Sequence, residues 1–212
     1  MLRWLYDWLA TSEVPRPCDV VFVLAGRECR KVFGLQLLNK CWTKTLLLSV
    51  GRFEVRRFSS LKVPADFDLA GIASAVEPRY RHYFVTMSAG GAEAARIPIG
   101  RLGTMSEIRA FSAWLKAHPA VRSVTVVSSG FHLRRIRMCC RRMIQDGVSL
   151  TFAAVPDEGE FSRDHWWRSA NARRLVISEL AKLAIYKLLG GVELRRARGF
   201  SGVVDSREVP AG

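Results

Sequence analysis

The stretch Ser123–Arg142 constrains the fold of this chain more than any other part of the sequence. It opens with the β-branched run 124–127, which is typical of a strand covered on both faces, as in a parallel sheet. Small residues at 128–130 permit a sharp turn, and apolar residues then recur at helical spacing over 133–143. The stretch therefore predicts a strand, a tight turn and a helix, which make half of a βαβ unit.

Further strand-like runs alternate with helical patterns along the chain. They lie at 19–24, 45–50, 82–87 and 148–155. Residues 88–95 are small and polar, which predicts a loop or a hairpin tip. Pro98 confines 96–100 to a short extended piece at an edge. Strands that alternate with helices favour a three-layer α/β fold. We expect a Rossmann-like, open, mostly parallel sheet of about five strands with helices on both faces.

The sequence suggests three segments. Residues 1–18 predict an amphipathic helix and a linker, 19–189 a single α/β domain, and 190–212 a flexible tail with glycines and mixed charges. An apolar stripe with Trp4 and Trp8 beside it runs along the first helix. This helix either packs onto the domain or, through residues 1–10, lies on a membrane surface, since interfacial tryptophans and a basic protein permit that.

The charge balance is strongly basic. Lys and Arg total 33 against 19 Asp and Glu, a formal charge of +14. This favours an anionic partner, with a solvated cationic surface as the alternative. No apolar run is long enough to cross a bilayer and no signal peptide is recognised, so we expect a cytoplasmic protein, either free or peripheral to the inner membrane. The five cysteines contain no C-x-x-C pair, which indicates reduced thiols, and no metal site is expected.

The turn at Ser128, Ser129 and Gly130 is the main candidate for a ligand site. His132 and Arg135 follow it, one helical turn apart on a shared face. A helix N-terminus and an arginine suit a phosphate or carboxylate group. With an ordinary pKa near 6.5, His132 suits a general acid or base, although a histidine here also has a purely structural interpretation, as a partner for the turn. Ser129 lacks the flanking glycines of a nucleophile elbow.

A second turn, Ala25-Gly26, follows the first predicted strand. We expect its backbone amides to face an anion, with Arg30 on the next helix beside it and Asp19 holding Arg30. If the first and fourth predicted strands are neighbours, this turn and the one at 128–130 share a crevice at the topological switch point. The end of the second strand adds two further ligand-binding candidates, Ser49 and Gly51.

Thr104 and Glu107 open the next predicted helix and allow two interpretations. Their spacing completes a capping box, which explains both residues structurally. Alternatively both face the cleft, where Glu107 or Glu179 orients the imidazole of His132. A row of arginines, 134, 137, 141 and 142, lies on the face of the following helix opposite its apolar residues. Such a face is either solvated or docks on nucleic acid or anionic lipid.

The pattern Ser-Ser-x-Phe-His-x-x-Arg at 128–135 resembles the end of the central strand in the YdcF-like family of bacterial proteins, much of which is of unknown function. The cluster 166–168 and Glu179 extend the resemblance, which is poorest in the middle of the chain. It implies a cleft-facing glutamate near 107, a link to cell-envelope or peptidoglycan-precursor metabolism, and S-adenosylmethionine or a nucleotide as cofactor, although the full dinucleotide fingerprint is absent. The leading hypothesis is an enzyme or a ligand-binding domain for a phosphate-bearing or nucleotide-like small molecule. If it is an enzyme, we expect an acid/base transferase or hydrolase, and nucleic acid is not the expected partner.

Overall fold

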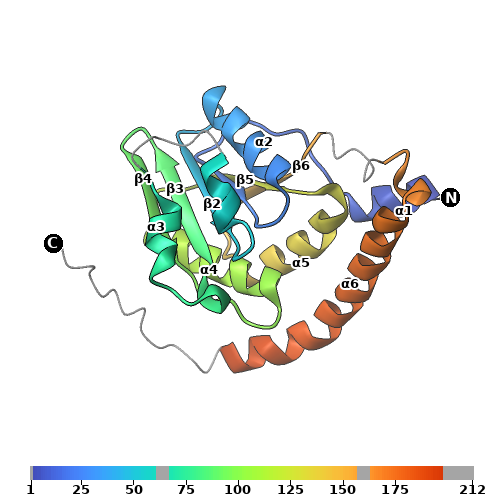
Figure 1. Cartoon of the computed structure of the whole chain (residues 1–212). Helices are drawn as coiled ribbons and strands as arrows, with labels where there is room; N and C mark the ends of the chain where they lie inside the picture. The colour runs from blue at the N-terminus through green and yellow to red at the C-terminus, as the bar shows by residue number, and fades with distance from the viewer. Residues whose placement is uncertain (1, 61–66, 157–162, 198–212) are drawn as a thin grey trace.

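The computed structural model describes residues 2–60, 67–156 and 163–197, and its centre is a six-stranded sheet of order β4-β3-β2-β1-β5-β6 (Figure 1). The strands are β1 (Val20–Val23), β2 (Thr45–Val50), β3 (Tyr83–Ser88), β4 (Gly91–Arg96), β5 (Ser123–Ser128) and β6 (Ser149–Ala154). Strands β2, β1, β5 and β6 are parallel, whereas β3 and β4 run antiparallel to their neighbours. The predicted Rossmann-like, mostly parallel α/β fold is confirmed.

The sixth strand, β4, corrects part of the prediction for 88–95. The loop interpretation is wrong for the residues of β4, whereas the hairpin-tip interpretation holds for 89–90, which connect β3 and β4. Strand β4 has the sequence GAEAAR, which lacks the β-branched residues that indicate strands. Ala92 and Ala94 are partly buried against the core and the other residues of β4 are exposed, so its pairing with β3 mainly holds it. In the predicted edge piece 96–100, Arg96 ends the edge strand and the Ile97 amide donates to the His82 carbonyl at 2.8 Å, while 98–100 belong to no strand.

Helices cover both faces of the sheet. They are α1 (Leu2–Leu9), α2 (Glu28–Asn39), η1 (Val55–Ser60), α3 (Leu69–Ser74), η2 (Pro78–Tyr80), α4 (Gly103–Ala117), η3 (Gly130–His132), α5 (Leu133–Met143), η5 (Trp166–Arg168) and α6 (Ala170–Ala197). On one face, α4 and α5 bury residues such as Phe111 and Ile136 against Phe22 of β1. On the other, α2, η1 and α3 pack against the alternate residues, such as Val21 and Val23.

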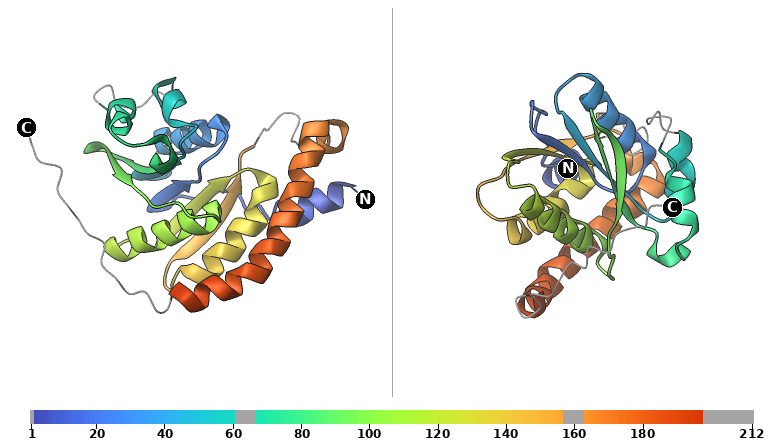
Figure 2. Two further views of the ribbon diagram at one scale, coloured as in Figure 1. Left: turned by 60° about the horizontal axis from the view of Figure 1, so that its bottom comes forward. Right: turned by 90° about the vertical axis from the view of Figure 1, so that its left-hand side faces the viewer.

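Helices α1 and α6 lie beyond α5 and share a third apolar cluster (Figure 2). Leu9 of α1 is fully buried there, and Phe131 of η3 joins it, so α1 packs onto the turn that follows β5. Helix α6 continues to Ala197, which corrects the predicted start of the tail at Gly190; residues 198–212 of that tail lie outside the described part. Within the described chain, none of the helices combines the length and apolarity that crossing a bilayer requires.

Candidate functional site

The two predicted turns meet at one end of the sheet. Strands β1 and β5 are parallel neighbours with Val23 opposite Val127, and the amide of Leu24 donates to the Val127 carbonyl at 3.2 Å. Because the chain leaves β1 toward β2 on one side and returns as β5 on the other, this is the topological switch point. The turns border a pocket of about 150 Å³, equal to the space of about five water molecules at roughly 30 Å³ each. It is lined by Leu24, Ala25, Gly26, Arg30, Thr104, Glu107, Ser128, His132, Arg135 and Ile136.

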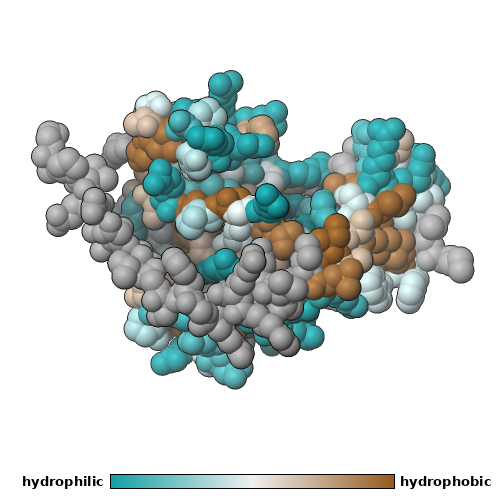
Figure 3. All heavy atoms as spheres, turned by 90° about the horizontal axis from the view of Figure 1, so that it is seen from below, coloured by the Kyte–Doolittle hydropathy of each residue, from teal (hydrophilic) through white to brown (hydrophobic). Residues whose placement is uncertain are grey.

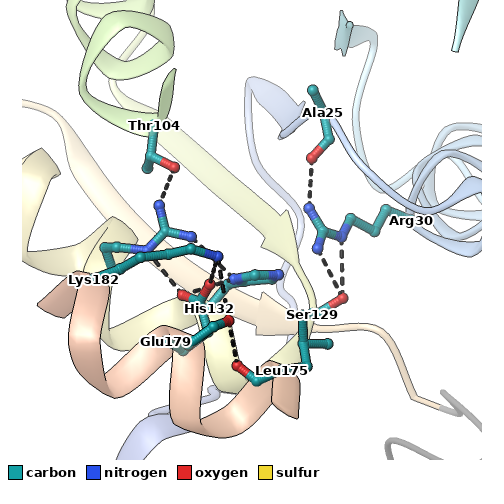
Figure 4. Close-up of polar contacts among 10 residues, drawn as sticks. Ala25, Arg30, Thr104, Ser129, His132, Leu175, Glu179 and Lys182 are labelled. Atoms are coloured by element: carbon teal, nitrogen blue, oxygen red, sulfur yellow. Dashed lines mark hydrogen bonds and ion pairs between the residues drawn. The ribbon is translucent and has the colours of Figure 1, made fainter. Parts of the chain in front are cut away.

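Arg30 ties the two turns together (Figure 4). Its Nη1 donates to the Ala25 carbonyl at 2.6 Å, and its Nε and Nη2 donate to Ser129 Oγ at 3.1 and 3.0 Å. Gly26 has a φ of +139°, and a Cβ at that position would lie 2.5 Å from Arg30 Nη1. A glycine is therefore required at 26 both by the backbone and by the guanidinium that crosses it.

The amides of the first turn do not face the pocket as donors for an anion, contrary to the prediction. The Ala25 amide donates to Glu107 Oε1 at 3.0 Å, and the Gly26 amide donates to Glu54 Oε1 at 2.6 Å. Glu54 also pairs with the buried Lys31. Burial and, to a smaller extent, the charge of Glu107 raise the pKa of Glu54, and together they outweigh the lowering by Lys31 and the Gly26 amide. The positive character of the pocket therefore comes from its arginines and not from these amides.

Glu107 joins the ends of neighbouring strands. Its Oε1 accepts a hydrogen bond from Ser49 Oγ at 2.6 Å, and His82 Nε2 lies 2.8 Å from that hydroxyl and 3.7 Å from the carboxylate. Burial raises the pKa of Glu107, but His82, Ser49 and the Ala25 amide together outweigh burial and hold it below its usual value. Glu107 is thus an ionised group that braces the strand ends, and it does not orient His132.

The capping interpretation of Thr104 and Glu107 is wrong. Helix α4 has Leu102 as its N-cap residue, with no side-chain capping hydrogen bond. The hydroxyl of Thr104 instead accepts a hydrogen bond from Arg135 Nη1. Both residues line the pocket, as the alternative interpretation required.

A partly buried His132 pairs with the buried Glu179, and both lie away from Ala25 (Figure 4). His132 Nδ1 lies 2.9 Å from Glu179 Oε2, and Glu179 is only 1% exposed. A carboxylate can only accept, so we assign the imidazole proton to Nδ1, which leaves Nε2 as the basic nitrogen. Arg135 Nη2, 3.1 Å from the same Nδ1, then lies beside the ring without donating to it.

The charge states of this pair follow from burial and from the neighbouring arginines. Burial lowers the pKa of His132, Glu179 raises it, and the charges of Arg30 and Arg135 lower it again, to about 3 in total. Burial raises the pKa of Glu179, but its contacts with His132, Arg135 and Lys182 outweigh burial and depress it. At neutral pH the site therefore holds a neutral imidazole oriented by an ionised carboxylate.

Arg135 is already engaged by protein groups. Its Nε donates to Glu179 Oε2 at 2.9 Å, and its guanidinium lies 5.2 Å from the centre of the Tyr186 ring. Arg135 therefore holds Glu179 in place as much as it contributes positive charge to the pocket.

Ser128 lines the pocket with a buried side chain. Its Oγ has no hydrogen-bond partner among the described residues, and Ser128 is 0% exposed. The Thr125 hydroxyl on the same strand is buried without a partner as well, so this feature of Ser128 does not by itself indicate a ligand.

Six predicted site residues lie outside the pocket lining: Glu179, which acts through His132 and Arg135, and Asp19, Ser49, Gly51, Ser129 and Gly130. Asp19 accepts hydrogen bonds from the amides of Arg122 and Ser123, both at 2.8 Å, at the start of β5. The prediction that Asp19 holds Arg30 is therefore wrong, because Asp19 lies at the opposite end of the sheet. A Cβ on Gly130 would lie 2.5 Å from Tyr6 Oη, so that glycine accommodates α1. A Cβ on Gly51 would lie 3.2 Å from Glu54 Oε1. Ser49 Oγ donates to Glu107 and Ser129 Oγ accepts from Arg30, so these two serines position other residues of the site.

Sequence reasoning missed His82 and Lys31. His82 precedes β3, and because β3 runs antiparallel to β2, the start of β3 lies beside the end of β2 at Val50. Only a prediction of that strand direction would have brought His82 to the site. Lys31 follows Arg30 near the start of α2 and pairs with Glu54. No motif or spacing in the sequence indicates that this lysine is buried.

Comparisons with protein-family models, with curated proteins and with solved structures find no match. The resemblance to the YdcF-like family therefore stays a prediction. Among the described residues, no three His, Cys, Asp or Glu side chains gather in a way that would hold a metal ion.

Proposed function

We propose that this protein is an enzyme that binds a phosphate-bearing small molecule at the switch-point pocket and uses His132 as a general base. The observation that carries the proposal is the pairing of His132 with Glu179 in the same pocket as Arg30. A neutral imidazole whose Nδ1–H is held by a carboxylate can accept a proton at Nε2, and Arg30 favours a negatively charged group beside it. A pKa of about 3 is low for a general base, and a negatively charged ligand beside the imidazole would raise the pKa of His132 toward neutral pH.

The size of the pocket limits which part of the ligand it takes. About 150 Å³ suits one anionic group, with the remainder of the molecule outside. Arg30, which lines the pocket, would hold this group. His132 would then remove a proton from a water molecule or a substrate hydroxyl, which supports a hydrolase or a transferase. The family resemblance further suggests a substrate related to cell-envelope precursors.

The arrangement of α5 disfavours the alternative of a non-catalytic module that docks through its arginine face. Arg134 donates to the Trp8 carbonyl, Arg137 pairs with Glu13, and Arg142 donates to the Tyr186 carbonyl at 3.0 Å. Three of the four arginines on this face therefore contact neighbouring segments of the chain and do not form a flat solvated surface.

The test is a screen of phosphate, pyrophosphate, sugar phosphates and nucleotides for thermal stabilisation of the full chain. A ligand at about 100 times its Kd adds about 2.7 kcal/mol of stability, which corresponds to roughly 5–11 °C for a chain of this length. We expect His132→Gln to keep this stabilisation and to lose turnover, while His118→Gln, at the C-terminal end of α4, changes neither. Turnover by His132→Gln at the wild-type rate would contradict the proposal.

A further inference from the structure

Helices α5 and α6 border a groove of about 500 Å³ that is separate from the switch-point pocket. Figure 2 shows the two helices side by side, with α1 near the start of α6. Helix α5 contributes Arg134, Arg137, Met138, Arg141 and Arg142; α6 contributes Leu180, Leu183, Ala184 and Lys187; Trp8 and Thr11 of the N-terminal segment complete the lining.

The two walls of the groove differ in chemistry because each helix presents a single face. Positions 134, 137, 138 and 141 of α5 follow the spacing i, i+3, i+4, i+7, and so do positions 180, 183, 184 and 187 of α6. The wall from α5 is therefore cationic around Met138, whereas the wall from α6 is apolar and ends in a lysine. Seen from below, apolar surface also gathers at the end of the molecule where α1 and the start of α6 lie (Figure 3).

The positive charge in the groove exceeds what the protein itself neutralises. Within the described part of the chain, Glu13 on Arg137 is the carboxylate that pairs with the lining cations. Arg141 and Lys187 are exposed and have no hydrogen-bond or ion-pair partner among the described residues. Burial lowers the pKa of Arg134, and the charges of Arg137 and Arg141 lower it further, as expected where cations crowd together. Among the described residues the groove thus has one paired carboxylate for five lining cations.

We propose that this groove binds a single-chain anionic amphiphile, an acyl or alkyl chain that carries a phosphate or carboxylate head group. The chain would lie along Leu180, Leu183 and Ala184, and the head group would meet Arg141 and Lys187. A free inorganic anion would leave the apolar wall unused, and so would a nucleic-acid backbone. The volume lies within the range of about 300–1,000 Å³ that is usual for small-molecule sites.

The test is calorimetric titration of the full chain with decyl phosphate below its critical micelle concentration. Inorganic phosphate supplies the head group alone, and decyl maltoside supplies the chain with a neutral head. Arg141→Glu reverses a charge that holds no other part of the protein, and Ala184→Trp fills the groove. Arg174→Glu, an exposed position of α6 outside the groove, makes the same change in net charge and is the matched control.

We expect decyl phosphate to bind the wild type at one molecule per chain and the two control ligands not to bind there. Arg141→Glu and Ala184→Trp should each weaken binding by about tenfold or more, a change of about 1.4 kcal/mol, while Arg174→Glu leaves it nearly unchanged. Equal losses in Arg141→Glu and Arg174→Glu would overturn the proposal in favour of diffuse attraction to an anionic membrane surface. Undiminished binding in a folded Ala184→Trp variant, checked by circular dichroism, would place the ligand elsewhere and would also overturn it.

Discussion

Replacing Glu179 by alanine should destabilise the protein strongly, because it leaves a buried cation without its counter-charge. Glu179 Oε2 lies 2.9 Å from both Arg135 Nε and His132 Nδ1, and Oε1 lies 2.8 Å from Lys182 Nζ. Arg135 is only 7% exposed, so after the change water would compensate its charge poorly. Breaking a buried ion pair in this way costs about 3–5 kcal/mol.

For a chain of this length that loss corresponds to a fall in Tm of roughly 6–20 °C, at about 2–4 °C per kcal/mol. Thermal and urea unfolding followed by circular dichroism measure it. The double variant Arg135→Met with Glu179→Leu should regain much of the stability, because it removes both charges and keeps apolar volume. Asp7→Ala, which breaks an exposed pair with Arg163, should have little effect. A loss in Glu179→Ala no larger than in Asp7→Ala, or no recovery in the double variant, would refute the reasoning.

Three further predictions follow from the same geometry. Because the pKa of His132 is about 3 in the folded protein and near 6.5 when unfolded, the unfolded state binds more protons between these values. Stability should therefore fall as pH drops below about 6.5, by about 2 kcal/mol at pH 5, and urea unfolding of His132→Gln should show a flatter pH profile. Gly26→Ala should lower the Tm because of its positive φ and the close guanidinium, whereas Gly103→Ala, with nothing within 4 Å, should not. Mass spectrometry after brief iodoacetamide treatment should find the exposed Cys41 alkylated and the buried Cys140, whose pKa is raised by burial, unmodified until the protein unfolds.

The parallel strands were predictable because burial on both faces leaves a continuous apolar run. This is true of Val20–Val23 and of the β-branched part of Ser123–Ser128, whose residues are nearly all buried. Strand β4 was not predictable in this way. Ala92 and Ala94 alternate against the core, but they are only partly buried, and alanine does not indicate a strand.

The place of the site was predictable, but many of its hydrogen bonds were not. The carboxyl ends of neighbouring parallel strands meet at one edge of a sheet, which is why Gly26 and His132 lie on the same pocket. The prediction for Asp19 was wrong because Asp19 directly precedes β1 and therefore lies at the opposite end of the strands from the pocket. The Ala25 and Gly26 amides bond to Glu107 and Glu54, which are distant in the sequence. The pattern of residues around the turn therefore could not predict these partners.

The proposed function requires a neutral His132, oriented by Glu179, beside a pocket that binds an anion. Nuclear magnetic resonance of the full chain with ¹⁵N-labelled histidine can observe this, first alone at pH 7 and then during titration with inorganic phosphate. We expect His132 to be protonated at Nδ1 and bare at Nε2, and we expect its signals to shift saturably with phosphate while those of His118 do not. A doubly protonated His132, or a ring that phosphate leaves unchanged, would contradict it.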